Sequence, residues 1–159
     1  MADRLTAADI ACWVIKSRTP PWDLDPGWLP GRARTLTHCL RHTYRVELMR
    51  PGQLCLLWLS GRVQPGVQAL GTLSSESSVP PRVREPTPEV EVTVALSRLT
   101  QPVERAVLQA DHVFSGAEVL RMPAGSNPSY LSPERLDVLV DLLRPTDLEN
   151  AGWDKCISR

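Results

Sequence analysis

Two short apolar runs constrain the fold of this chain more than any other feature of its sequence. They cover residues 11–16 and 54–59, and neither shows a clean alternation of apolar and polar side chains. Short runs without alternation are typical of strands that are buried on both faces of a sheet. The first run ends abruptly at Lys16 and Ser17, so it predicts a buried strand whose end reaches the surface.

The lysine at the end of the first run is unusual in this chain, which has two lysines against sixteen arginines. An ammonium group is compact, whereas the guanidinium group of arginine is a planar fork, so the two are not equivalent at a confined position. Lys16 is therefore a candidate functional residue. The alternative is a solvated charge at the end of a strand.

Length and charge restrict the class of protein. A chain of 159 residues indicates one domain, which we expect over residues 1–145, followed by a polar, loose tail over 146–159. The formal net charge is zero, so any binding of nucleic acid depends on a local basic patch. The N-terminus lacks a signal-peptide pattern and no apolar run suits a membrane helix, so we expect a cytoplasmic protein without membrane contact.

Periodicity and turn residues predict the other elements. Strands are expected at residues 67–73, 89–99 and 117–122, and helices at residues 22–25, 37–48, 102–110 and from Ser132 onward. The 37–48 helix rests on an apolar residue at every fourth position. Gly71 marks a bulge or a close backbone approach. The expected class is α+β, with a small mixed, mostly antiparallel β-barrel and short peripheral helices.

A colinear series of short motifs runs from about residue 11 to residue 143. Its members are Trp13-Val14-Ile15-Lys16-Ser17, the Leu48–Gln53 turn with the 54–60 strand, the 66–73 strand, the 89–103 segment, Ala124–Asn127 and Ser132-Pro133-Glu134. The series resembles the EVE domain family, within the larger group that includes PUA and YTH domains. The chain departs from the family pattern after Ser17 and in the loop at residues 28–34. The resemblance implies a PUA-like barrel that accepts a modified nucleobase in a pocket, flipped out of a duplex or single-stranded.

Aromatic residues are candidates for the walls of that pocket. Trp28 lies in a loop and Trp58 lies near the exit of a strand, so the two indoles could hold a planar base between them. Trp13 is a further candidate for contact with the ligand. The alternative for Trp13 and Trp58 is packing in the core.

Four polar residues fall at strand exits or in loops: Lys16, Ser17, Ser60 and Asn127. If the barrel closes as the resemblance implies, they converge on one rim. Asparagine presents a donor and an acceptor together, and serine hydroxyls rotate to suit, so such a group could read the edge of a base. For Asn127 the alternative is a simple turn residue.

The segment from Gly31 to Arg50 is basic, with five arginines against one glutamate. Candidates for contact with the phosphate backbone are Arg32, Arg34, Arg41 and Arg45. The alternative is a solvated helix face.

Catalytic patterns are missing from the sequence. There is no nucleophile elbow, phosphate-binding loop or dinucleotide fingerprint. His38 and His42 stand four residues apart on the expected helix but have no third metal ligand. We therefore expect a monomeric binding module, without cofactor or metal, whose partners are nucleic acid with a modified base, DNA or RNA, and an effector protein.

The free energies of methyl burial and of hydrogen bonding indicate which kind of base modification the site can read selectively. Burying one methyl group gains about 0.8 kcal/mol, whereas a paired hydroxyl discriminates far more strongly. A selective module is therefore expected to read a polar modification, most simply of cytosine. The main alternative is a PUA-like domain that binds structured RNA without a base pocket, and a third is a small hydrolase or metal protein.

Overall fold

The computed structural model describes residues 4–74, 89–125 and 127–157. The strands are β1 (Cys12–Ser17), β2 (Ala33–Arg41), β3 (Leu54–Leu59), β4 (Gly66–Leu73), β5 (Glu89–Glu104) and β6 (Ser129–Leu131). The α-helices are α1 (Pro21–Leu24), α2 (Arg105–Ala110), α3 (Glu118–Arg121), α4 (Pro133–Leu142) and α5 (Pro145–Asn150). Short 3-10 turns are η1 (Ala7–Asp9), η2 (Tyr44–Leu48), η3 (Phe114–Gly116) and η4 (Trp153–Lys155).

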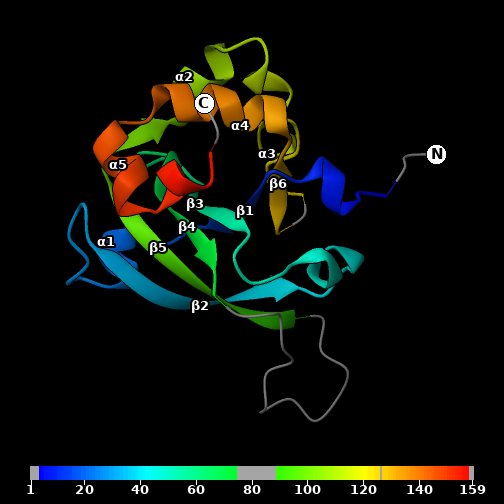
Figure 1. Cartoon of the computed structure of the whole chain (residues 1–159), viewed down its shortest axis with the longest axis horizontal. Helices are drawn as coiled ribbons and strands as arrows, with labels where there is room; N and C mark the ends of the chain where they lie inside the picture. Colours follow the sequence, from blue (N-terminus) through cyan, green and yellow to red (C-terminus); the bar gives the residue numbers. More distant parts are fainter. Residues whose placement is uncertain (1–3, 75–88, 126, 158–159) are drawn as a thin grey trace.

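The six strands form one strongly curved sheet in the order β2-β5-β4-β3-β1-β6 (Figure 1). Strands β1 and β3 are parallel, and the other neighbours are antiparallel. The two edge strands approach at one point, where the backbone N–H of Arg41 donates to the carbonyl of Asn127 at 3.2 Å. No strand ladder joins β2 to β6 within the described residues. The mixed α+β class is confirmed, but the sheet is open and the predicted barrel closure is not confirmed.

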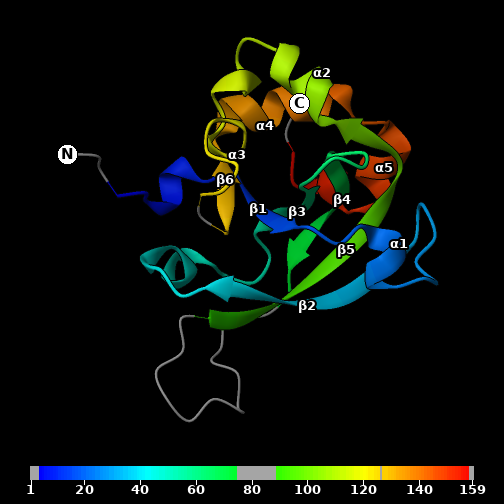
Figure 2. The ribbon, with the colours of Figure 1, turned by 180° about the vertical axis from the view of Figure 1, so that it is seen from behind.

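Two hydrophobic cores occupy the two faces of the sheet. Successive residues of β1 and β3 point alternately into one core and the other, which is why neither run alternates with polar residues. The first core, which contains Trp58, lies under α2 and α4. The second core, which contains Trp13 and Trp28, is enclosed by the curl of the sheet toward β2. Figures 1 and 2 show α2, α4 and α5 together on the side of the molecule opposite β2.

The predicted helix over 37–48 is wrong. Its residues form the end of β2 and the turn η2. Leu36, His38 and Leu40 turn inward while the residues between them are exposed, which is a period of two. An apolar residue at every fourth position fits a period of two as well as a helix, and β-branched threonines in the segment favour the strand.

Two further expectations need correction. Residues 117–122 contain the short helix α3 and not a strand. The predicted loose tail is ordered over its described part, where α5 and η4 pack against the sheet. Asp147 is 2% exposed and accepts hydrogen bonds from the backbone N–H and the hydroxyl of Thr100. The indole of Trp153 is fully buried and donates to the carbonyl of Gly71 at 2.9 Å.

The predicted strands at 11–16, 54–59 and 67–73 and the short helix at 22–25 agree with β1, β3, β4 and α1 within one residue, whereas β6 and the first part of β2 were not predicted. Helix α2 begins at Arg105 because β5 continues through Pro102 and Val103 to Glu104. The start of α4 after Ser132 is confirmed, although the side chain of Ser132 makes no capping hydrogen bond. Most of the segment between β4 and β5, residues 75–88, lies outside the described residues. No helix among the described residues is long and apolar enough to cross a membrane.

The inward-facing His38 gives a testable pH dependence. Burial lowers the pKa of its imidazole, so the folded protein favours the neutral form. The unfolded chain binds a proton at about pH 6.5, and the contribution of His38 is therefore present above that pH and lost below it. We expect the free energy of unfolding to fall between about pH 7 and pH 5, and to fall less in His38→Gln. Urea titrations of both proteins at several pH values in this range measure the free energy of unfolding. If this free energy falls equally with pH in wild type and in His38→Gln, the prediction is contradicted.

Candidate functional site

A small polar pocket lies at the carboxyl ends of the parallel strands β1 and β3. Its volume is about 240 Å³. It is lined by Lys16, Ser17, Arg18, Ser60, Pro123, Ala124, Gly125 and Asn127. We call it the Lys16 pocket. The structure therefore brings together the four polar residues that the sequence placed on one rim, because the parallel register sets Ser17 beside Leu59 and leads Ser60 to the same end.

Asn127 holds the end of β1 with its side chain. Its Oδ1 accepts from the backbone N–H of Lys16 at 3.0 Å, and its Nδ2 donates to the carbonyl of Lys16 at 3.0 Å. Backbone pairing between β1 and β6 ends at Val14 and Ser129. The side-chain amide of Asn127 continues this pairing at Lys16, two residues further along β1. An asparagine amide has two donor hydrogens and two acceptor positions. Asn127 therefore keeps one donor and one acceptor for a ligand.

The ammonium group of Lys16 connects the end of β1 to the turn at residues 122–125. Its Nζ donates to the carbonyls of Pro123 at 3.2 Å and Gly125 at 3.0 Å. The turn at residues 122–125 is closed by a hydrogen bond from Gly125 N to the carbonyl of Met122 at 2.8 Å. Burial lowers the pKa of Lys16, Arg45 lowers it further, and Glu118 opposes both. This arrangement is more than a solvated strand end, and it leaves one ammonium hydrogen unused.

The two serines of the pocket differ. Ser17 uses its hydroxyl locally, donating to the carbonyl of Thr19 at 2.8 Å and accepting from the Thr19 backbone N–H at 3.0 Å. The Oγ of Ser60 makes no hydrogen bond to the part of the chain that the structure describes. Of the two serines, Ser60 is therefore the one whose side chain is available to a ligand.

An ion pair lies behind the pocket. The guanidinium of Arg45 grips the carboxylate of Glu118 with two hydrogen bonds of 2.7 Å, and their side chains are 12% and 14% exposed. The hydroxyl of Ser129 also donates to Glu118 at 2.8 Å, and Arg45 donates to the carbonyl of Pro128 at 3.2 Å. Burial raises the pKa of Glu118, but the hydrogen bonds from Arg45 and Ser129 and the nearby charges outweigh burial and lower it.

This pairing changes the reading of the basic segment. Arg45 was predicted to contact phosphate, but its guanidinium pairs with Glu118 inside the protein and is only 12% exposed. Arg34 is partly engaged as well, at 2.9 Å from Asp25 and 3.0 Å from the carbonyl of Gly27. Arg32 and Arg41 are exposed near opposite ends of β2. Arg41 lies near Asn127, whereas the carbonyl of Arg32 accepts a hydrogen bond from the indole N–H of Trp28.

The predicted aromatic walls are not formed. Trp13 and Trp28 are fully buried in one core, Trp58 is 3% exposed in the other, and none of them lines the Lys16 pocket. The indole of Trp13 donates to Gln53 at 2.8 Å and that of Trp28 to the carbonyl of Arg32 at 2.7 Å. Because these polar atoms are satisfied inside the protein, burying the rings leaves no unpaired donor there. Core packing is therefore the correct reading for all three tryptophans.

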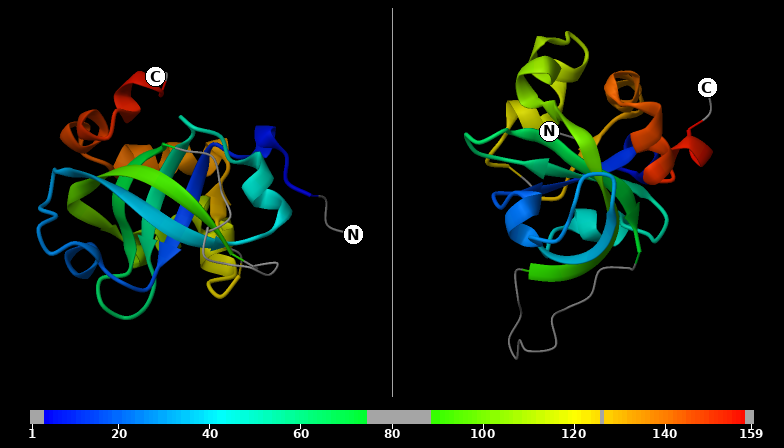
Figure 3. Two further views of the ribbon diagram at one scale, coloured as in Figure 1. Left: turned by 90° about the horizontal axis from the view of Figure 1, so that it is seen from below. Right: turned by 90° about the vertical axis from the view of Figure 1, so that its left-hand side faces the viewer.

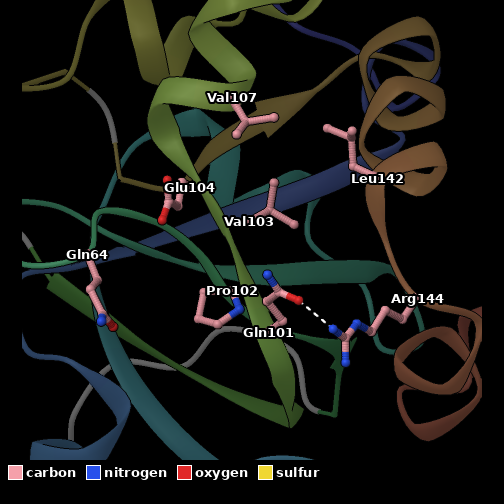
Figure 4. Close-up of a pocket in the computed structure, with 8 residues that line it drawn as sticks. All are labelled: Gln64, Gln101, Pro102, Val103, Glu104, Val107, Leu142 and Arg144. Atoms are coloured by element: carbon pink, nitrogen blue, oxygen red, sulfur yellow. Dashed lines mark hydrogen bonds between the residues drawn. The ribbon is translucent and has the colours of Figure 1, made fainter.

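A larger cavity of about 410 Å³ lies beyond the loop at residues 60–65 (Figure 4). It is lined by Gln64, Gln101, Pro102, Val103, Glu104, Val107, Leu142 and Arg144. Arg144 is engaged there by a hydrogen bond to Gln101. Apolar side chains from β5, α2 and α4 form much of its wall, and no polar residue singled out by the sequence lies in it. The Lys16 pocket is therefore the better candidate site.

Metal chemistry finds no support in the described residues. No group of three or more histidine, cysteine, aspartate or glutamate side chains among them could hold a metal ion. His38 lies within β2 and His42 follows that strand, so their spacing does not place them on one helix face.

The same fold occurs in solved structures of other proteins, although no family model and no curated protein matches the sequence. A protein from Pseudomonas putida is 18% identical with a TM-score of 0.65, over 83% of this chain and 99% of that one. The DUF55 domain of human thymocyte nuclear protein 1 is 18% identical with a TM-score of 0.56, over 82% and 96%. Human THYN1 protein in complex with 5-methylcytosine-containing DNA is 17% identical with a TM-score of 0.52, over 82% and 96%.

The chain shares the fold of these proteins, which include the DUF55 domain, and this agrees with the resemblance to the EVE domain family. At these identities the likeness establishes the fold, and the ligand has to be argued from the site of this chain.

The sequence patterns did not predict three parts of the site. Glu118 was overlooked because its partner Arg45 is 73 positions away and no local pattern joins them. Pro123 and Ala124 were overlooked as pocket walls because a turn has no periodic signal. Arg18 stands directly after Lys16 and Ser17, so its neighbourhood in the chain was the one available signal.

Proposed function

We propose that this chain is a binding module for nucleic acid that carries a modified base, and that the base enters the Lys16 pocket. The observation that carries this proposal is the unused hydrogen-bonding capacity of Lys16, Ser60 and Asn127 around one small concave site. The complex of the human THYN1 protein, which has the same fold, contains 5-methylcytosine DNA and supports the same class of ligand here.

The size of the pocket favours a single base. Its volume of about 240 Å³ lies below the roughly 300–1,000 Å³ of pockets for larger ligands. The free donor and acceptor of Asn127 match the edge of a base, which also presents donors and acceptors side by side. A base in a duplex has to be flipped out before it can enter, whereas a single-stranded base enters directly.

Stacking in this pocket is assigned to Arg18 and to the turn at residues 122–125. A guanidinium plane stacks on a base much as an aromatic ring does, and Arg18 is exposed on the pocket wall. Pro123 and Ala124, which also line the pocket, supply apolar contact. This replaces the tryptophan sandwich that the sequence predicted.

The selectivity of the site follows from the polar lining. A methyl group gains about 0.8 kcal/mol on burial, which is only about fourfold in affinity. A hydroxyl that pairs with Ser60 or with the free donor of Asn127 contributes more, because its absence leaves a buried polar group unpaired. We therefore propose a preference for a polar modification of cytosine over a methyl group.

Titration of labelled oligonucleotides tests the proposal. Single- and double-stranded probes carrying one plain, methylated or hydroxymethylated cytosine are compared by fluorescence anisotropy at moderate salt. Arg18→Ala is expected to weaken binding by about tenfold, since stacking on a base is worth about 1–3 kcal/mol. Ser60→Ala is expected to reduce the preference for the hydroxymethylated probe without altering stability, because Ser60 Oγ bonds to no described residue.

Arg32→Ala is the matched control, because Arg32 is exposed just before β2 and lies outside the pocket. Its effect should be small beside that of Arg18→Ala. If Arg32→Ala and Arg41→Ala weaken binding while Arg18→Ala does not, the protein binds nucleic acid through β2 without a base pocket. Absence of binding to every probe would refute the proposed function.

A further inference from the structure

Two exposed apolar side chains stand on the loops that flank the Lys16 pocket. Val63 is 68% exposed and Met122 is 55% exposed, and they are two of five large apolar side chains with high exposure among the described residues. Val63 belongs to the loop at residues 60–65, whose Ser60 lines the pocket. Met122 begins the turn at residues 122–125, whose Pro123, Ala124 and Gly125 also line the pocket.

Each of these apolar residues directly follows an exposed arginine. The pairs are Arg62-Val63 and Arg121-Met122, and neither loop contains an acidic residue. Both views in Figure 3 show the two loops projecting from the same side of the molecule, near the end of β1. Arg18 adds a third exposed guanidinium at the pocket. The loop at residues 60–65 and the turn at residues 122–125, which we call the two lips of the pocket, therefore combine positive charge with exposed apolar side chains.

The lip that carries Met122 is held rigidly. The backbone N–H of Met122 donates to the carbonyl of Glu118 at 2.7 Å, and its carbonyl accepts from Gly125 at 2.8 Å. Lys16 pins the same turn through two carbonyls, and the carboxylate of Glu118 is fixed by Arg45. An exposed methionine on a fixed turn presents its side chain to a partner at little cost in loop ordering.

We infer that the two lips grip a double-stranded nucleic acid, with Met122 and Val63 as apolar wedges that fill the space left by the extruded base. Apolar side chains inserted between base steps stabilise unstacked and kinked duplexes in other proteins. Arg62 and Arg121 neutralise the phosphates on either side of the extruded nucleotide. This inference rests on the proposed function and specifies its substrate as a duplex.

The wedge accounts for a requirement that the pocket alone leaves unmet. Extruding a base breaks its pairing and stacking, and a pocket without an aromatic wall has limited means to offset that loss. A wedge acts only on a duplex, because a single strand has no gap to fill. The arginines act on both forms, because both carry phosphates.

The test compares two probes of one sequence, a duplex and a single strand, each carrying one modified cytosine beside a 2-aminopurine. The double variant Val63→Ala/Met122→Ala should lose about tenfold or more in affinity for the duplex and less than about twofold for the single strand. Binding of wild type should raise the 2-aminopurine fluorescence of the duplex, which reports unstacking, and the double variant should lose this rise. Leu29→Ala is the matched control, since Leu29 is 60% exposed but lies outside the pocket.

The arginine pair has a different signature. Arg62→Ala/Arg121→Ala should weaken binding of both probes and reduce the slope of log affinity against log salt by about two for the duplex. Equal losses on duplex and single strand in Val63→Ala/Met122→Ala would overturn the wedge while leaving the base pocket in place. If Arg18→Ala leaves the affinity for the single-stranded probe unchanged, the proposed function is refuted instead. Duplex binding without any change in 2-aminopurine fluorescence would overturn extrusion directly.

Discussion

Replacing Gly71 by alanine is expected to destabilise the protein by about 3 kcal/mol or more, at or above the usual range for overpacked cores. A Cβ at this position would lie 1.7 Å from the carbonyl oxygen and 2.7 Å from the carbonyl carbon of Ala95. Both are backbone atoms of β5, so the clash is relieved only if β4 and β5 move apart in the middle of the sheet. The carbonyl of Gly71 also accepts a hydrogen bond from the buried indole N–H of Trp153. A displacement of β4 therefore also disturbs the C-terminal segment.

Chemical denaturation of Gly71→Ala against wild type measures this effect. The matched control is Gly27→Ala, whose added Cβ would meet its nearest atoms at ordinary contact distances of 3.5 and 3.9 Å. Gly27→Ala should stay within about 0.5 kcal/mol of wild type. If Gly71→Ala is as stable as the control, the prediction is wrong and β4 and β5 separate at Gly71 with little loss of stability.

Glu118→Leu is the second substitution with a large expected effect, a loss of about 3–5 kcal/mol. The change removes the carboxylate that receives two hydrogen bonds from Arg45 and one from Ser129. Arg45 would then remain as a largely buried charge without its partner. The turn at residues 122–125 begins at the helix that carries Glu118, so base binding should weaken along with stability.

The double variant Arg45→Met/Glu118→Leu separates charge from packing. Because a buried pair replaced by apolar residues is often neutral for stability, we expect it to recover most of the loss. It should also resist acid better than wild type. The lowered pKa of Glu118 contributes stability above the unfolded value of about 4.3, and this contribution disappears as pH falls through the folded value. No recovery in the double variant would contradict this account.

Much of the fold could be read from the sequence where local signals were unambiguous. Strand β3 was predicted with its observed bounds, and β1 and β4 within one residue, because their short length and the turn residues that flank them fit buried strands. The end of β2 was misread because apolar residues at every fourth position satisfy both a helix and a strand. The tail was misread because Asp147 and Trp153 find partners 47 and 82 positions away.

The sequence by itself determined the strand ends that carry Lys16, Ser17 and Ser60, and it placed Asn127 with them through the colinear motifs. It could not decide which face of the sheet each tryptophan enters, because one step along a strand exchanges the two faces. Tertiary structure alone decided that the indoles fill two cores, that Arg45 pairs with Glu118, and that Arg18 and the 122–125 turn line the pocket. The physical reason is that strand ends follow from local apolar pattern, whereas pairing and burial depend on contacts between residues far apart in the chain.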